Sequence, residues 1–205
     1  MNPAVALASA LLGATAALPA ARLAEHAAHN PMPHPRCLRL TLAALGAPFT
    51  AAAAAQHGWS ASASLLVLVP AAAAAAVDAH EQRLPDPLTA ATALVVAIEL
   101  AVLTASGHDS GPRGAVVLAA AAAVCLAAKA TLPAAIGWGD IKLAPSLAAL
   151  LAAQGWPALY TGLLAWSALV LTTAVVGITR RRPAEIVAYG PALVGGTACA
   201  IAFSG

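Results

Sequence analysis

The sequence predicts an all-α fold: a polytopic membrane protein built as a helical bundle of about eight transmembrane helices. The chain has 205 residues, of which 61% are hydrophobic and only 9% are charged, whereas a soluble domain is about half apolar and about a quarter charged. Apolar runs of about 18 residues or more recur along the whole length, and a run of that length can cross a bilayer as a helix. No basic stripe interleaved with aromatic residues is present, so the expected surroundings are the lipid bilayer and not nucleic acid.

Eight apolar segments are the expected helices, in chain order. They cover residues 3–21, 39–56, 60–77, 88–106, 114–132, 141–154, 156–178 and 188–204. The sixth is the shortest and contains Pro145, and the turn Gln154-Gly-Trp-Pro157 separates it from the seventh. Pro157 suits the first turn of the helix that follows. Because alanine dominates these segments, we expect the helices to pack closely through small residues.

The basic residues predict the orientation of the helices. With eight crossings, segments 22–38, 78–87, 133–140 and 179–187 lie on one side, and nine of the ten Lys and Arg residues lie in or beside them. The tenth is Arg113. Because basic residues accumulate on the cytoplasmic side, this side is expected to face the cytoplasm and both termini to face outward. A cleavable signal peptide is the less favoured interpretation of the first segment, because Arg22 follows that segment and no basic residue precedes it.

The cysteine and histidine spacing predicts no metal site. The three cysteines form no C-x-x-C pair; they are Cys37, Cys125 and Cys199. The 22–38 segment is rich in histidine, but its spacing matches no zinc pattern; these residues are His26, His29 and His34. We therefore expect neither a metal nor an organic cofactor.

Two aspartates in short polar breaks are the candidate functional residues. Asp78 follows the third predicted helix and Asp140 precedes the sixth. Two crossings separate them, so they return to the same face of the membrane whichever way the chain is inserted. An acidic residue at the edge of a membrane span is a functional-site candidate, although a lone aspartate there is more often a helix cap. Two close carboxylates can share one proton and activate water, which is the chemistry of aspartic proteases.

The residues that flank each aspartate end or loosen helices. After Asp78, Pro85 and Pro87 interrupt the chain, and Asp86 is the expected N-cap of the next helix. Before Asp140, Gly137 and Gly139 allow a close approach of neighbouring backbone. These segments are the expected place for a substrate strand to lie.

At these residues the chain resembles the type IV prepilin peptidases, a family of membrane aspartic proteases. Three segments carry the resemblance: Leu84-Pro-Asp-Pro-Leu-Thr89, Gly137-Trp-Gly-Asp-Ile-Lys-Leu143 and Tyr189-Gly190-Pro191. The resemblance covers about residues 60–205. It implies that Asp78 and Asp140 are the catalytic pair. The residues that it implies as substrate or support residues are Pro85, Gly137, Gly139, Lys142, Gly190 and Pro191.

The resemblance also implies a substrate and a location. The substrate would be a prepilin or pseudopilin, the partner of a pilus, secretion or competence machine, and its leader peptide would be removed at the cytoplasmic face of the bacterial inner membrane. Residues 1–59 are the expected N-terminal two-helix region and 60–205 the peptidase domain. Many members carry paired C-x-x-C motifs and a methylation function in the N-terminal region; only Cys37 stands there, so we expect a minimal, peptidase-only form.

Several alternatives stay open on the sequence. A small proton-coupled transporter would use Asp78, Glu99 and Asp140 as a relay at different depths. A non-catalytic membrane scaffold descended from the peptidase would need neither aspartate. Lys142 could tune the aspartate pair, contact substrate backbone or only anchor its helix at the membrane surface. The sequence does not predict the oligomeric state.

Overall fold

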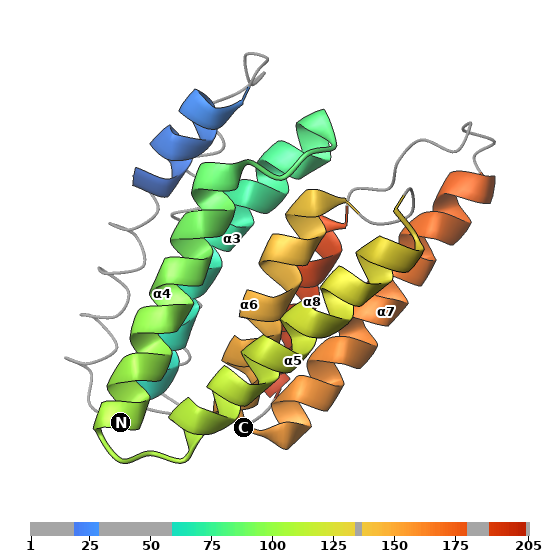
Figure 1. The fold of residues 1–205 in the computed structure, drawn as a ribbon. Coiled ribbons are helices and arrows are strands. Elements are labelled where there is room, and N and C mark those ends of the chain that lie inside the picture. The colour runs from blue at the N-terminus through green and yellow to red at the C-terminus, as the bar shows by residue number, and fades with distance from the viewer. Residues whose placement is uncertain (1–18, 29–58, 134–136, 180–188, 204–205) are drawn as a thin grey trace.

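A computed structural model describes residues 19–28, 59–133, 137–179 and 189–203, and within these ranges every regular element is a helix. A short helix covers residues 19–27. Six longer helices follow: α3 (Trp59–Glu81), α4 (Asp86–Ala105), α5 (Ser110–Thr131), α6 (Trp138–Gln154), α7 (Trp156–Thr179) and α8 (Gly190–Phe203) (Figure 1). The all-α membrane fold that the composition predicts is confirmed.

Three of these helices are long and apolar enough to cross a membrane, namely 86–105, 110–131 and 156–175, and the apolar part of α8 is shorter. The described part of the chain therefore supports an integral membrane protein but not the count of about eight spans. The predicted segment 39–56 and most of 3–21 lie outside the described residues. The helix at 19–27 continues past residue 21, where the first predicted segment ended.

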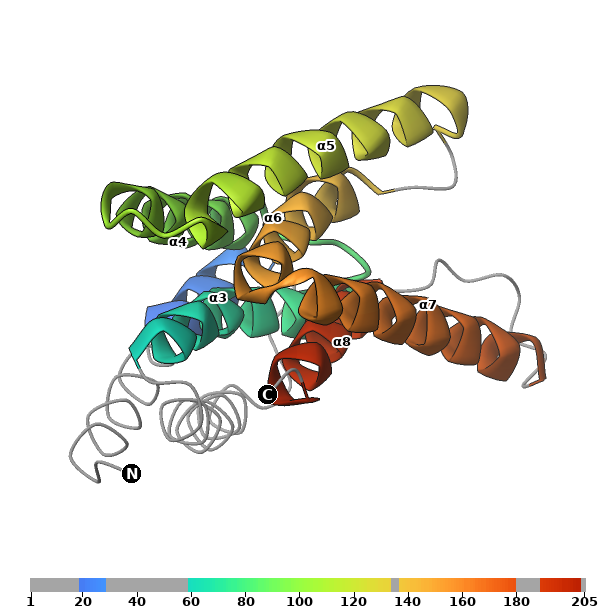
Figure 2. The same cartoon turned by 90° about the horizontal axis from the view of Figure 1, so that it is seen from below.

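Helix α6 is the central element of the bundle. It contacts α3, α4, α5, α7 and α8, and nearly all of its residues from Leu143 to Ala153 are buried. With 17 residues, it is roughly 25 Å long, which is less than the ~30 Å of bilayer hydrocarbon. A helix that is apolar on most sides is stable when it is buried in a bundle or in a membrane. Figure 2 shows α4 and α5 on one side of α6, with α7 and α8 on the other.

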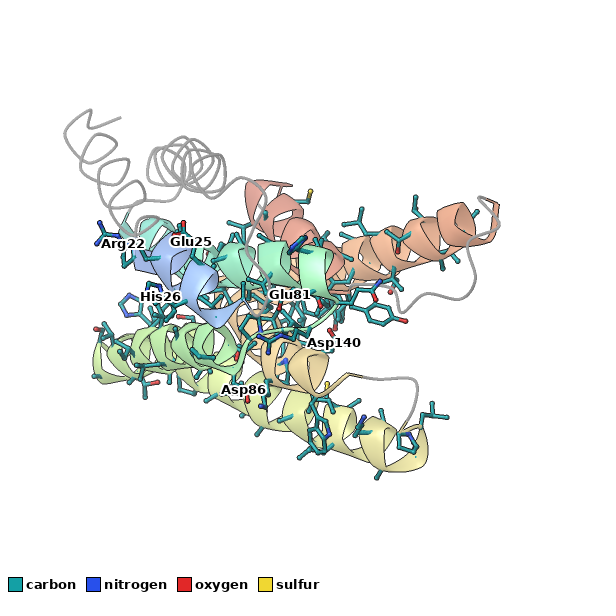
Figure 3. The ribbon with its side chains drawn as sticks, turned by 90° about the horizontal axis from the view of Figure 1, so that it is seen from above. Arg22, Glu25, His26, Glu81, Asp86 and Asp140 are labelled. Atoms are coloured by element: carbon teal, nitrogen blue, oxygen red, sulfur yellow. The ribbon has the colours of Figure 1, made fainter. Side chains whose placement is uncertain are left out.

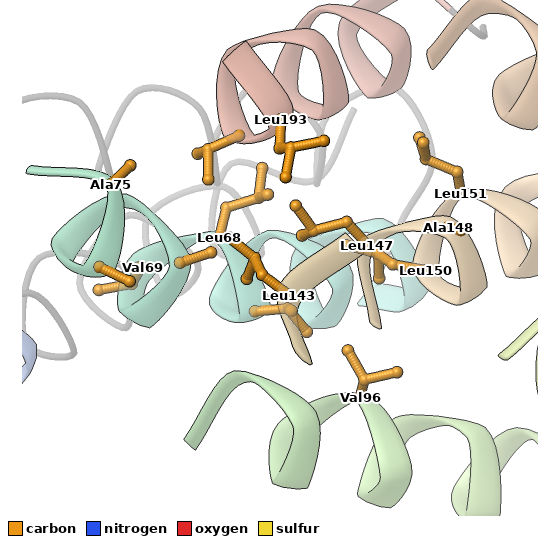
Figure 4. Close-up of a cluster of buried hydrophobic side chains, with 14 of the residues drawn as sticks. Leu68, Val69, Ala75, Val96, Leu143, Leu147, Ala148, Leu150, Leu151 and Leu193 are labelled. Carbon is orange, nitrogen blue, oxygen red and sulfur yellow. The ribbon is translucent and has the colours of Figure 1, made fainter. Parts of the chain in front are cut away.

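The core of the bundle consists of leucine, valine and alanine side chains from several helices (Figure 4). Leu143, Leu147 and Leu150 of α6 are fully or almost fully buried, and Val96 of α4 and Leu193 of α8 pack in the same cluster. Burying a leucine side chain is worth about 1.5–3 kcal/mol. Ala20, Ala21 and Ala24 of the short helix join this cluster, so this helix packs against the rest of the bundle.

Polar contacts fix neighbouring helices at one end of the bundle and within it. The Arg113 side chain donates hydrogen bonds of 2.6 and 3.1 Å to the carbonyl oxygens of Ala152 and Ala153 at the end of α6, where a cation also complements the helix dipole. Trp166 of α7 donates a buried hydrogen bond of 3.1 Å to the Thr197 hydroxyl of α8. The structure thus gives a structural role to Arg113, the basic residue that the sequence places apart from the others.

Candidate active site

Asp78 lies in the last turn of α3 and is buried, with an exposed fraction of 5%. Its Oδ2 accepts a hydrogen bond of 2.9 Å from the backbone N–H of Gly190, the first residue of α8. A helix N-terminus carries unpaired N–H groups and a partial positive charge, both of which favour a nearby carboxylate. The structure therefore brings together two of the sequence-predicted site residues, from segments 112 positions apart.

Gly190 is a glycine because there is no room for a side chain. A Cβ on this residue would lie 2.9 Å from Asp78 Oδ2 and 3.2 Å from Asp78 Cβ, closer than side chains normally approach. Pro191 follows in the first turn of α8, where a missing N–H is tolerated. The Gly-Pro pair thus starts α8 directly against the carboxylate of Asp78.

Asp140 lies in the first turn of α6, which begins at Trp138. The helix starts three residues before the predicted residue 141, because Gly137, with an extended backbone, is its N-cap. A Cβ on Gly137 would lie 3.0 Å from Asp140 Oδ2, so the carboxylate folds back over the start of its own helix.

Asp78, Asp140 and Gly190 lie at the same end of the bundle, the upper end in Figure 1, where α3 ends and α4, α6 and α8 begin. Figure 3 looks onto this end, with Asp140 near the middle of the view and Asp86 at the start of α4.

The pKa values of both aspartates are raised. Both residues lie at helix ends, outside the three helices that are long enough to span the membrane. Burial raises the pKa of Asp78, and the hydrogen bond from Gly190 opposes that shift. Burial and then the charge of Asp78 raise the pKa of Asp140 to about 6, against the effect of a backbone hydrogen bond from Gly137. The charge of Asp78 therefore acts on the ionisation of Asp140.

Leu84 begins the first of the three resemblance segments, but the sequence predicted no role for its side chain. It is buried in the segment between α3 and α4, where its neighbours Gln82 and Asp86 are exposed. A Cβ on Gly139 would lie only 2.4 Å from Leu84 Cβ, so Gly139 must be a glycine for the first turn of α6 to pack here. A single apolar residue in an otherwise polar break was the signal that could have identified it.

Lys142 points across the site to the start of α4. Its Nζ lies 2.6 Å from Oδ1 of Asp86, and both side chains are well exposed. Asp86 was expected to cap α4, but Pro85 is the N-cap residue and makes no side-chain cap hydrogen bond. Asp86 is instead the first helical residue, free to pair with Lys142, and the Thr89 hydroxyl donates to the Asp86 carbonyl at 3.0 Å.

The other candidates lie apart from this pair. Glu99 is in the second half of α4, more than two turns from its start at Asp86. Within the described ranges, no three His, Cys, Asp or Glu side chains gather as a metal site. His26 is exposed on the short helix and bonds the Arg22 carbonyl, while His29, His34 and Cys37 lie outside the described residues. What this end of the bundle offers chemically is two carboxyl groups, one buried at Asp78 and one partly buried at Asp140, each beside backbone N–H groups.

Comparison with known proteins identifies the family. Residues 65–178 match the type IV leader peptidase family, and this range holds more than half of the 205 residues and both aspartates. No curated protein and no solved structure matches the chain. The resemblance that the sequence motifs carry is therefore confirmed, and the chain belongs to the type IV leader peptidase family.

Proposed function

We propose that this protein is a membrane aspartic endopeptidase that removes the leader peptide of type IV prepilin-like proteins at the cytoplasmic face of the inner membrane. The observation that carries the proposal is the position of Asp78 and Asp140. They come from different helices and lie at one end of the bundle, where the charge of Asp78 acts on Asp140. Family membership supports leader peptides as the substrate class.

The proposed mechanism follows from the sharing of one proton by the two carboxyl groups. The protonated carboxyl donates a hydrogen bond to the scissile carbonyl oxygen and polarises it. The ionised one takes a proton from a water molecule, which attacks the carbonyl carbon. Each carboxylate also accepts a backbone N–H, from Gly190 or from Gly137. Because two interacting carboxyl groups titrate as a pair, we assign neither role to a named aspartate.

The remaining site residues have supporting roles in this proposal. Gly139 and Gly190 allow the close packing that brings the aspartates together, and Lys142 holds the start of α4 through Asp86. We also propose that the chain crosses the membrane about eight times, with both termini outside. Residues 60–205 form the peptidase domain, and no methylation activity remains.

The purified protein in proteoliposomes, mixed with a prepilin from the same genome, tests the proposal. We expect the prepilin to lose its leader, seen as a gel shift, with one new N-terminus by mass spectrometry. Glu99→Gln is the discriminating variant, since a peptidase should tolerate it and a proton relay should not. If no prepilin of a panel is cut although an established leader peptidase cuts each one under the same conditions, the proposal is wrong.

A further inference from the structure

Leu84 lies where the three segments of the site meet. Its Cβ, Cγ and Cδ1 atoms face Gly139, at 2.4, 3.1 and 2.9 Å from the place where a Cβ of that residue would stand. Its Cδ2 faces Gly190, 3.3 Å from the corresponding place on that residue. The same side chain therefore contacts the residue that precedes Asp140 and the residue whose N–H binds Asp78.

The local backbone directs this side chain inward. α3 ends at Glu81, and Gln82 has a φ of +53°, in the left-handed region that residues with a side chain seldom adopt. The N–H of Gln82 still bonds the Asp78 carbonyl at 2.7 Å, so the chain turns immediately after the catalytic helix. Pro85, with φ −68° and ψ 129°, then fixes the other side of Leu84. A conformation of this kind persists only where the surrounding structure holds it.

We propose that Leu84 is a positioning residue that sets the separation of the Asp78 and Asp140 carboxylates. This inference rests on the proposed function. One contact path runs from Leu84 through Gly190 to Asp78, and the other through Gly139 directly to Asp140. Both glycines lack a Cβ, and the Leu84 side chain reaches the backbone of each: it is the nearest group to Gly139, and at Gly190 it lies beside Asp78. Shortening it would let α6 and α8 shift, and a shift near 1 Å can lower a rate about 100-fold.

The matched control is Leu100, in the last turns of α4. It is also buried, and it also packs on a glycine: a Cβ on Gly114 would lie 2.4 Å from Leu100 Cδ2. Leu100 lies at the opposite end of α4 from the aspartates. Leu84→Ala and Leu100→Ala therefore remove the same atoms from comparable glycine contacts, and only the first is beside the site.

The experiment measures kcat, KM and the pH dependence of leader cleavage for wild type, Leu84→Ala, Leu84→Met and Leu100→Ala, per folded molecule. We expect Leu84→Ala to lower kcat at least about tenfold with little change in KM, because alignment and not binding is lost. The alkaline limb of the pH–rate profile of Leu84→Ala should move to lower pH. Carboxylates that lie farther apart repel each other less, so the second of the two loses its proton at lower pH. Leu84→Met should restore most of the rate, and Leu100→Ala should keep wild-type kcat and pH dependence.

A second readout separates failure of this inference from failure of the proposed function. The aspartate carboxyl groups are titrated by carbon-13 NMR in detergent, with Asp78→Asn and Asp140→Asn for assignment. Leu84→Ala should shift the paired titration and Leu100→Ala should not, even if the wild type cuts no prepilin. Equal effects of the two variants, or none from Leu84→Ala, would overturn the inference. If Leu84→Ala does not fold, Leu84→Val and Leu100→Val replace the pair.

Discussion

At the residue scale, the contact between Asp78 and Gly190 makes the sharpest steric prediction. Gly190→Ala would place a Cβ 2.9 Å from Asp78 Oδ2, so the carboxylate must move and its backbone hydrogen bond must lengthen. We expect a loss of cleavage of about 100-fold from such a displacement, measured as kcat on a prepilin, with the protein still folded.

The control for this variant is Gly195→Ala on the same helix. A Cβ there would lie 3.6 Å from Leu169 Cδ1, an ordinary contact. Gly195→Ala should retain near wild-type cleavage. Wild-type activity in Gly190→Ala would show that the Asp78 to Gly190 contact is not needed for the reaction.

The raised pKa of Asp140 predicts a pH dependence of stability. The folded-state pKa is about 6 and the ordinary value 3.8, so the folded state holds a proton between these values that the unfolded state has lost. The contribution of Asp140 to stability is therefore full below about pH 4 and is lost as pH rises through about 6. The free energy of unfolding in detergent should fall across this window in the wild type and stay flatter in Asp140→Asn. If the free energy of unfolding falls equally steeply with pH in the wild type and in Asp140→Asn, the raised pKa of Asp140 is contradicted.

At the element scale, the contact between Lys142 of α6 and Asp86 of α4 defines what Lys142 does. Because both side chains are exposed, the pair should stabilise the fold by only about 0.2–1 kcal/mol, and less at high salt. We expect Lys142→Gln, Asp86→Asn and the double variant to lower cleavage to the same small extent, as the second change removes nothing further. A much larger loss from Lys142→Gln alone would show that Lys142 also contacts substrate.

Individual elements show what the sequence could and could not predict. The aspartates and Gly139 were predicted because polar and glycine-rich breaks between apolar helices are uncommon and constrained, and Gly190 was predicted from the family resemblance. The start of α6 was placed three residues late, because Gly-Trp-Gly resembles a loop until packing on Leu84 makes it helical. The partner of Lys142 lies 56 positions away, and such a pairing depends on how the helices pack. Leu84 was missed for the same reason.

At the scale of the whole molecule, the arrangement predicts which segments share a side of the membrane. The break between α3 and α4 lies at the site end of the bundle, and the α4–α5 connection lies at the other end (Figure 1). In a variant whose native cysteines are replaced, Gln82→Cys should be labelled by an impermeant thiol reagent only from the cytoplasmic side. Ser106→Cys should be labelled only from outside. Labelling of both positions from one side would contradict this arrangement.

The measurement that tests the central claim most directly is leader cleavage by Asp78→Asn and Asp140→Asn, with Asp109→Asn as the control. Asp109 is exposed and precedes α5 at the far end from the site. Each of the first two substitutions removes one carboxyl group and nearly keeps its shape, so each should lower kcat by about 10²–10⁴-fold, the range for lost acid–base catalysis. Asp109→Asn should cleave like the wild type. Cleavage that persists in Asp78→Asn and Asp140→Asn would contradict the aspartic mechanism.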